Sequence, residues 1–230
     1  MKLIIKWILI YNIKFIMTDT KIDNSNTSTE EHDVDMHIQT SKSQCYTFNS
    51  YVDKESADYL LSECLKLTLL ENPPIKIFGR ICYQKRSVGF FSDSSKGYKY
   101  SGQILVSQQL PEFLRTLLVD VNKSLSTDFN GILVNLYKNG NDSIGFHSDS
   151  ESDLAKGTSG PLVASISLGT SRTFRVRSKT GNMSEKSILT DHGQLLVMAG
   201  AFQKEFTHGI NAEPSISEPR ISLTFRRHLV

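Results

Sequence analysis

The stretch N-L-Y-K-N-G-N-D-S-I-G-F-H-S-D, residues 135–149, decides how the rest of the chain is interpreted. It ends in His147-Ser148-Asp149, where an imidazole and a carboxylate stand two residues apart. In an extended backbone this spacing sends both side chains to the same face. One further histidine would complete the two-histidine, one-carboxylate face on which non-haem Fe(II) oxygenases hold their metal. The pair alone is also typical of a polar strand end on a protein surface, so its interpretation depends on the rest of the chain.

The support comes from the last quarter of the chain. His208 is followed by Arg220-Ile-Ser-Leu-Thr-Phe-Arg226, whose alternation predicts a strand with both guanidinium groups on one face. A solvated strand face is the alternative interpretation of the two arginines. The presence of both histidines favours a site.

Composition describes a globular domain. The 230 residues are 39% hydrophobic and 22% charged, which is enough for one sizeable core plus tails. Residues 17–72 carry 4 Lys and 11 Asp or Glu, whereas residues 73–230 carry 19 Lys or Arg and 13 Asp or Glu. A mildly basic body with an acidic leader is compatible with a polyanionic partner. The scattered Cys45, Cys64 and Cys82 form no C-x-x-C pair, which favours an intracellular protein, nuclear or cytoplasmic and not secreted.

The N-terminal region separates into two parts. The first sixteen residues are apolar with interspersed lysines, too short for a membrane span of roughly 20 residues and without the small-residue cleavage site of a signal peptide. We interpret them as an over-extended start before Met17, with an interfacial anchor as the alternative. The following residues, up to Ser43, are mostly polar and predict a disordered acidic leader, so that residues 1–43 stand apart from the folded protein.

Residues 44–130 are predicted to form an N-terminal extension of helices and hairpins. Asp53 has the position of an N-cap, Asn72-Pro73-Pro74 stops that helix, and Pro111 opens a second helix running to about residue 125. Between the helices, residues 75–102 interleave basic and aromatic side chains. This pattern suits nucleic acid, because cations meet phosphates while rings stack on bases, although a strand pair with one buried aromatic face gives the same pattern.

After residue 130 the sequence pattern changes to short apolar segments separated by turn residues. Expected strands cover 131–137, 144–147, 162–168, 173–177, 186–190, 195–199, 205–210 and 220–227. Many short strands at such intervals point to a closed or double-sheet antiparallel barrel such as a jelly roll. The predicted fold class is therefore mainly β with flanking helices (α+β), with the barrel over residues 131–230.

With these pieces in place, the chain from about Cys45 onward resembles the AlkB family of Fe(II)- and 2-oxoglutarate-dependent dioxygenases. The resemblance rests on six ordered motifs: N-x-Y at 135–137, H-x-D at 147–149, S-x-S-L-G-x-x-R-x-F at 165–174, H-G-x-L-x-x-M at 192–198, Q-x-x-F-x-H at 203–208 and R-x-S-x-T-F-R at 220–226. It is most similar to the eukaryotic members that repair alkylated DNA, because of the H-x-D-x-E at 147–151 and the segments 77–79 and 98–102. Ser222 and Phe206 depart from the commoner Asn and Trp of the family.

The resemblance implies a double-stranded β-helix that holds Fe(II) through His147, Asp149 and His208, with 2-oxoglutarate and O₂ as co-substrates. It implies that 2-oxoglutarate is bound by Asn135, Tyr137, Arg220, Thr224 and Arg226, with Arg220 on the distal carboxylate and Arg226 near the carboxylate at the metal. It also implies nucleic-acid contacts from Phe78, Arg86, Tyr98, Tyr100, Ser101 and Glu151. In this interpretation Tyr100 and His147 sandwich a flipped base, and Tyr98 and Glu151 bond to its edge. The position of Phe78 in an expected hairpin turn with basic neighbours predicts a wedge that fills the vacated stack, with a core position as the alternative.

The implied activity is oxidative demethylation of 1-methyladenine and 3-methylcytosine in DNA, with release of formaldehyde, succinate and CO₂. Three alternatives stay open: an RNA demethylase on the same fold, a non-catalytic nucleic-acid-binding module, and a protein hydroxylase. The complete metal and arginine set disfavours the second, and the basic and aromatic segment disfavours the third. We expect DNA, single- or double-stranded, as the partner, possible action on RNA, and a monomer without a stable protein partner.

Overall fold

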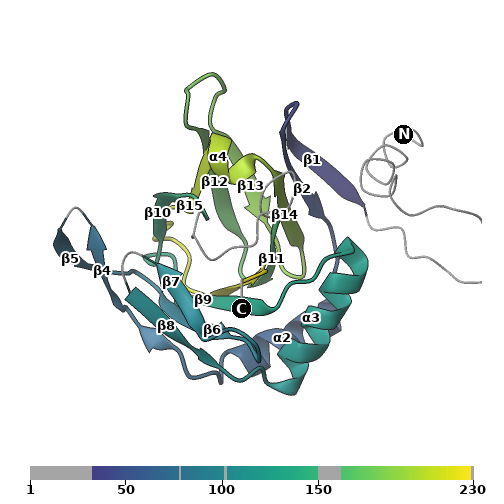
Figure 1. Ribbon diagram of the computed structural model, residues 1–230, viewed down its shortest axis with the longest axis vertical. Helices are drawn as coiled ribbons and strands as arrows, with labels where there is room; N and C mark the ends of the chain where they lie inside the picture. The colour runs from purple at the N-terminus through teal and green to yellow at the C-terminus, as the bar shows by residue number, and fades with distance from the viewer. Residues whose placement is uncertain (1–32, 78, 101–102, 150–161, 229–230) are drawn as a thin grey trace, which may run out of the picture. The chain divides into compact units, whose positions relative to one another are not determined.

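The computed structural model describes residues 33–77, 79–100, 103–149 and 162–228 (Figure 1). Every described residue belongs to one compact unit, His32–Val230. Among the described residues, none of the helices has the length and apolar character needed to cross a membrane.

Two sheets dominate the fold, and their strand pairs are antiparallel except for the parallel pair β6–β8. The larger has ten strands in the order β1-β2-β14-β11-β16-β9-β6-β8-β7, with β3 paired to β6. Their bounds are β1 Val34–Gln39, β2 Ser43–Phe48, β3 Leu70–Glu71, β6 Ser87–Phe91, β7 Gly97–Tyr100, β8 Gln103–Gln108, β9 Gly131–Tyr137, β11 Val163–Gly169, β14 Leu195–Gly200 and β16 Arg220–Arg226. The smaller has the order β10-β15-β12-β13, with bounds β10 Ile144–His147, β12 Arg172–Ser178, β13 Lys186–Thr190 and β15 Phe206–Ile210. Strands β4 (Pro74–Ile77) and β5 (Arg80–Tyr83) form a separate hairpin.

In the described part of the chain three helices accompany the sheets: α2 (Lys54–Cys64), α3 (Glu112–Leu125) and the short α4 (Phe202–Glu205). Figure 1 shows α2 and α3 together on one side of the larger sheet, away from the smaller one. The core between these helices and the sheet includes Leu60, Leu114 and Leu223. A second core cluster includes Phe174 and Val176 of the smaller sheet together with Tyr137 and Met198 of the larger. The fold is the predicted jelly roll with flanking helices.

Strand β16 shows how the alternation of sequence creates a site. Ile221, Leu223 and Phe225 belong to the core cluster that includes the helices' buried leucines. Because side chains alternate across a strand, Arg220, Ser222, Thr224 and Arg226 point to the opposite face, where they line a cavity. All seven residues are nevertheless buried. The polar face is therefore enclosed rather than solvated, which rules out the surface-strand interpretation of the two arginines.

The helix boundaries differ in detail from the predictions. Asp53 is the N-cap of α2, accepting a hydrogen bond from the Ser56 backbone N–H at 3.0 Å. The helix ends at Cys64 rather than near the prolines, since the chain turns there and enters β3. Pro111 is the N-cap of α3 rather than its first helical residue.

One sequence prediction was wrong. Residues 34–39 fall within the predicted disordered leader but form β1, which pairs antiparallel with β2. Val34 and Met36 pack against the helix-side core, and Ile38 is buried in the second cluster. Asp35, His37 and Gln39 alternate with them. The mean hydropathy of the stretch is therefore low, although one side of the strand is apolar. The division of the remaining chain at residue 131 stays a prediction, and strands from both sides of it share the larger sheet.

Candidate active site

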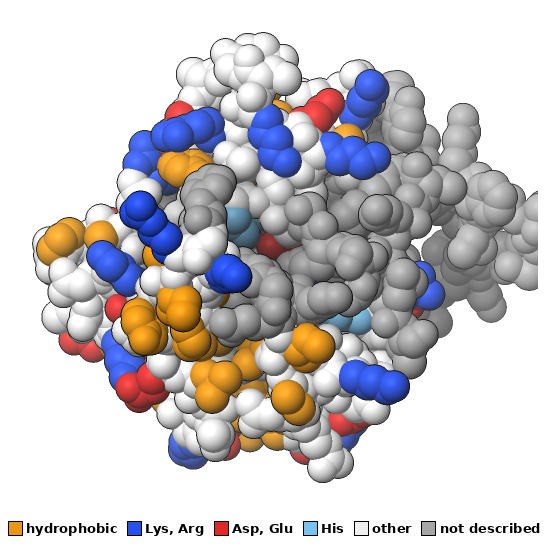
Figure 2. Space-filling model, turned by 60° about the vertical axis from the view of Figure 1, so that its left-hand side comes forward, with side chains coloured by type: hydrophobic (Ala, Val, Ile, Leu, Met, Phe, Trp, Pro, Cys, Tyr) orange, Lys and Arg blue, Asp and Glu red, His pale blue; other side chains and the backbone are white. Residues whose placement is uncertain are grey.

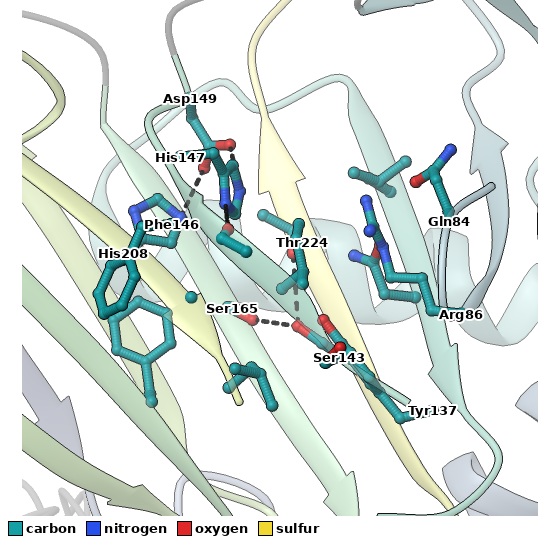
Figure 3. Close-up of a pocket in the computed structure, with 18 of the residues that line it drawn as sticks. Gln84, Arg86, Tyr137, Ser143, Phe146, His147, Asp149, Ser165, His208 and Thr224 are labelled. Carbon is teal, nitrogen blue, oxygen red and sulfur yellow. Dashed lines mark hydrogen bonds and ion pairs between the residues drawn. The ribbon is translucent and has the colours of Figure 1, made fainter. Parts of the chain in front are cut away.

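A cavity of about 670 Å³ opens between the two sheets. Strands β9, β11 and β16 of the larger sheet and β10 and β15 of the smaller contribute to its wall. Figure 3 shows His147, Asp149 and His208 grouped on one side of it, and Gln84 and Arg86 on the other.

The predicted metal ligands come together at one end of this cavity. His147 and His208 lie directly opposite one another in the β10–β15 ladder. Their Nε2 atoms each lie 3.7 Å from a different carboxylate oxygen of Asp149. One ligand atom from each of the three residues can be chosen so that all lie within 4.8 Å of one another. Two imidazole nitrogens and one carboxylate oxygen on a single face are the donor set that suits Fe(II) with positions left for other ligands.

Hydrogen bonding sets the tautomer of one ligand. The Nδ1–H of His147 donates to the Gly145 carbonyl at 2.9 Å, and because a carbonyl can only accept, Nε2 keeps its lone pair for the metal. His208 is held differently. Its ring stacks on Phe174 with centroids 5.2 Å apart, and its buried Nδ1 has no hydrogen-bond partner among the described residues.

Electrostatics put all three side chains in the form that binds metal. Burial raises the pKa of Asp149, but the charges of Arg226, His208 and His147 outweigh this effect and hold the pKa at about 2. Burial, reinforced by the neighbouring His147, lowers the pKa of His208 to about 3. Desolvation in the cavity lowers the pKa of His147 as well. At neutral pH the site therefore offers a carboxylate and two neutral imidazoles, as metal binding requires.

Arg220 provides a buried cation at another part of the cavity wall. Its side chain is 2% exposed, and Nη2 donates to the hydroxyls of Ser167 at 2.8 Å and Thr190 at 3.3 Å. Its Nε and Nη1 have no hydrogen-bond partner in the described part of the chain. Burial lowers its pKa, which shows the cost of enclosing this charge. A guanidinium with free donors facing a cavity is suited to binding a carboxylate.

Arg226 is engaged by protein groups. Its Nη2 donates to Asp149 Oδ1 at 2.8 Å, and its Nη1 donates to the Tyr98 hydroxyl at 3.2 Å. The guanidinium carbon also lies 5.0 Å from the Tyr98 ring centroid. Arg226 therefore connects strand β7 to the metal end of the cavity.

The remaining predicted co-substrate residues line the cavity in two ways. Asn135 and Tyr137 reach it from β9, but the Asn135 Oδ1 already accepts a hydrogen bond from Arg86 Nε at 2.8 Å. Thr224 is part of a row of hydroxyls, with its Oγ1 3.5 Å from Ser222 Oγ, which lies 2.7 Å from Ser165 Oγ. Ser222, which departs from the family pattern, is thus accommodated by a hydroxyl partner on the adjacent strand.

The predicted nucleic-acid residues are only partly described. Arg86 and Tyr98 line the cavity, but Tyr98 is 7% exposed and its ring packs near Phe90 and His228. Its contact with a base edge stays a prediction. Phe78, Ser101, Glu151 and the side chain of Tyr100 lie outside the described residues.

Sequence reasoning missed several cavity-lining residues, because single polar or aromatic residues carry no spacing signal. They include Gln84, Ser143, Phe146, Ser165, Ser167 and Thr190. The S-x-S alternation at 165–167 was a usable signal, since it places both hydroxyls on one face of β11. Phe146 has its ring 4.1 Å from the Arg177 guanidinium carbon.

Apolar and basic side chains are both exposed on the strands near the cavity. Figure 2 shows histidine and acidic atoms visible in the middle of one face, with Lys and Arg side chains and orange apolar side chains around them. The strongly exposed apolar residues include Ile81 and Tyr83 of β5 and Ile104 and Val106 of β8, each at least 64% exposed. Tyr83 and Lys85 line the cavity itself.

Comparisons with known proteins agree with this geometry. The model of the 2OG-Fe(II) oxygenase superfamily matches residues 44–226. Human alpha-ketoglutarate-dependent dioxygenase alkB homolog 3 is 33% identical over 203 residues, covering 81% of this chain and 67% of the relative. The DNA oxidative demethylase ALKBH2 of Arabidopsis thaliana is 29% identical over 209 residues, which cover 80% of this chain and 62% of the relative. The solved structure titled "The structure of OsALKBH1" has a TM-score of 0.58 at 15% identity over 84% of this chain and all of that one, and therefore shares its fold.

Proposed function

From its membership of the AlkB family within the 2OG-Fe(II) oxygenase superfamily, we propose that this chain demethylates alkylated nucleobases in DNA. The chain is an Fe(II)- and 2-oxoglutarate-dependent dioxygenase. The proposed lesions are 1-methyladenine and 3-methylcytosine. The observation that carries the proposal is the presence, in one cavity, of the metal triad and a buried arginine with open donors.

We assign the metal to His147, Asp149 and His208. When bound, iron supplies the oxidation of an N-methyl group by O₂, coupled to the conversion of 2-oxoglutarate into succinate and CO₂. The chain contributes neutral imidazoles and an ionised carboxylate through the pKa shifts described above. It leaves the cavity side of the ligand set open, which co-substrate binding requires.

Arg220 is assigned to the distal carboxylate of 2-oxoglutarate. Ser167 and Thr190 orient the guanidinium from one side and leave Nε and Nη1 for the ligand. Enclosure strengthens such a charge-assisted pair, because water does not compete for the donors. Tyr137, whose ring centroid lies 5.4 Å from the guanidinium carbon, borders the same space.

Arg226 is assigned a place between Asp149 and the carboxylate at the metal. The hydrogen bond from Arg226 fixes Oδ1 of Asp149. The other carboxylate oxygen, Oδ2, lies 3.7 Å from His208 Nε2 and is left for the metal. Thr224 and Asn135 are assigned to the polar wall along the co-substrate. In this assignment Arg86 orients Asn135 as well as facing the substrate side.

A nucleic-acid substrate is supported by the chemistry of the cavity mouth and by the relatives. One of the relatives is named as an alkB homologue and another as a DNA oxidative demethylase. Lys85, Arg86 and the exposed Tyr83 combine cations with an aromatic ring at the entrance. The methylated atom of these lesions lies on the base-pairing edge, so the base must leave the stack to reach the metal. A monomeric state and an intracellular location stay predictions.

The test is a side-by-side measurement of formaldehyde and succinate release. Purified protein with Fe(II), 2-oxoglutarate and O₂ is given oligonucleotides carrying 1-methyladenine or 3-methylcytosine, as single-stranded DNA, duplex DNA and RNA. We expect stoichiometric release of both products with DNA, and none from His147→Ala or His208→Ala. Preferential turnover of the RNA oligonucleotides would replace the DNA proposal by the RNA alternative. Release of neither product from any oligonucleotide would refute demethylation.

A further inference from the structure

The three metal ligands are not held equally well by the strands that carry them. His147 and His208 are paired partners in the β10–β15 ladder, so the sheet itself sets their separation. Asp149 lies two residues beyond the end of β10, where no ladder bond acts on its backbone. Something other than the sheet must hold this carboxylate against the two imidazoles.

Arg226 holds the Asp149 carboxylate itself, through the bond to Oδ1 described above. Two further hydrogen bonds hold the chain at Ser148 and Asp149, and both involve the segment that leads into His208. The Ser148 hydroxyl donates to the Phe206 carbonyl at 2.8 Å. The backbone N–H of Asp149 donates to Gln203 Oε1 at 2.9 Å. Gln203 belongs to α4, which runs directly into β15 and therefore into His208. The H-x-D ligands are thereby tied to the element that bears the third ligand.

The Gln203 amide is itself fixed at both ends. Its side chain is buried, at 3% exposure, and its Nε2 lies 3.5 Å from Met198 Sδ as a donor. Its backbone carbonyl accepts a hydrogen bond from Lys179 Nζ at 2.8 Å. An amide that donates to sulfur on one side presents its oxygen to Asp149 on the other. Contacts within the protein therefore hold the acceptor oxygen in position.

We propose that Gln203 is a positioning residue for the metal site, which orders Asp149 as a ligand by accepting its backbone N–H. The proposal rests on the metal site of the proposed function but not on the nature of the substrate. Groups that orient metal ligands typically change metal affinity about 10- to 100-fold when removed. A purely structural role, in which Gln203 only satisfies a buried N–H, would lower stability without a specific effect on metal affinity.

The chain contains a matched control. Gln194 is also buried, and its Oε1 accepts the backbone N–H of an aspartate, Asp191, at 3.3 Å. Its Nε2 donates to Asn49 Oδ1 at 2.7 Å. Gln194 lies in the turn between β13 and β14 and is not among the residues that line the cavity. Replacing either glutamine by methionine removes the same kind of bond.

The experiment measures Mn(II) binding by the full chain after chelation and dialysis, using the electron paramagnetic resonance signal of free Mn(II). Gln203→Met should raise the Mn(II) dissociation constant about tenfold or more, whereas Gln194→Met should leave it at the wild-type value. Both should lower the melting temperature of the metal-free protein. The readout needs no substrate, so a failure of demethylation and a failure of this proposal appear in different experiments.

Two further variants keep the test decisive if Gln203→Met does not fold. Gln203→Asn keeps the amide but is one carbon shorter, by roughly 1.5 Å, and should also weaken Mn(II) binding. Gln203→Glu keeps an acceptor oxygen at the same reach and should bind Mn(II) as the wild type does. Wild-type Mn(II) affinity in Gln203→Asn would overturn the proposal. So would equal losses of affinity in Gln203→Met and Gln194→Met.

Discussion

Arg226 donates to the carboxylate of Asp149 at 2.8 Å, with both side chains almost fully buried. A metal ligand and a cationic residue assigned to the co-substrate are thus paired in the protein itself. The pair compensates two charges that would each be costly to bury alone. It also helps to hold the pKa of Asp149 at about 2, so the ligand is ionised before metal binds.

This pairing predicts a stability effect that depends on metal. Arg226→Leu leaves the Asp149 carboxylate buried without its ion-pair partner, which typically costs about 3–5 kcal/mol. Bound Mn(II) compensates the carboxylate, so the loss of melting temperature should be larger in EDTA than with Mn(II). Arg227→Leu is the control, since its ion pair with Asp128 is exposed and such pairs contribute about 0–1 kcal/mol. Equal losses for Arg226→Leu with and without Mn(II) would contradict the prediction.

Arg220 should control the affinity for 2-oxoglutarate without supporting the fold. Removing one partner of a buried charge pair costs about 2–5 kcal/mol, so Arg220→Met should raise the Michaelis constant for 2-oxoglutarate about thirty-fold or more. In the described part of the chain the guanidinium has no acidic partner. The melting temperature without co-substrate should therefore not fall. An unchanged Michaelis constant, measured by succinate formation, would place the distal carboxylate elsewhere.

Acid should destabilise the metal-free protein through His208. Its pKa is about 3 in the folded protein and about 6.5 when unfolded. Between these values the unfolded chain binds the additional proton, so stability rises with pH from about 3 to 6.5 and is then constant. The slope of this contribution is at most about 1.4 kcal/mol per pH unit. Urea unfolding in EDTA at pH 5 and pH 7 should show the loss in the wild type and a smaller loss in His208→Gln.

The metal-induced gain in melting temperature should depend little on pH in the same range. Mn(II) binds the neutral imidazole, and His208 is already neutral in the folded protein well above its pKa of about 3. The gain should therefore be nearly equal at pH 7 and pH 5 and should decrease only as the pH approaches 3. A wild type and a His208→Gln variant with the same pH dependence in EDTA would show that another group titrates. Asp149 contributes at lower pH. Its pKa is about 2 in the folded protein and about 4 when unfolded, so its contribution to stability is lost only as the pH falls from about 4 toward 2.

Two of the ligands, His147 and Asp149, could be predicted from their spacing, which has a direct geometric meaning, whereas His208 as the third came from the family resemblance. An H-x-D at the end of a strand and alternating residues in β16 place side chains on one face whatever the rest of the fold does. The contacts of Asp149 with Gln203 and Arg226 could not be predicted in this way. Gln203 is 54 positions and Arg226 is 77 positions from Asp149 in the sequence. Only the tertiary arrangement of α4 and β16 brings the two side chains to Asp149.

Other differences arose where composition and periodicity conflict. In β1, Val34, Met36 and Ile38 alternate with polar residues, and the low average hydropathy concealed a strand. In α2, helical spacing of apolar residues continues past Cys64, but the chain leaves the helix to form β3 against β6. Tertiary pairing decided both cases. Neither affects the site, because β1, α2 and β3 contribute no residue to the cavity wall.

The last prediction concerns how a duplex would be opened. Strands β4 and β5 pair from Pro74–Tyr83 to Ile77–Arg80, so only residues 78 and 79 connect them. Gly79 has φ +81°, a conformation that favours glycine in a tight turn. Lys76 and Arg80 are exposed on this hairpin and can meet phosphates. We predict from the sequence that Phe78, which lies outside the described residues, is the apolar wedge that replaces a flipped base.

Phe78→Ala should therefore act selectively on duplex substrates. Extruding a base from a stack costs a few kcal/mol, and a single-stranded substrate needs no replacement partner. We expect about a tenfold or greater loss of formaldehyde release with methylated duplex DNA, little loss with the single strand, and an unchanged melting temperature. Ile81→Ala is the control, because Ile81 is an exposed apolar residue, 72% accessible, on the same hairpin but in strand β5 rather than in the turn. Equal losses on both substrates with a large fall in melting temperature would instead make Phe78 a core residue, and duplex repair would then lose its structural basis.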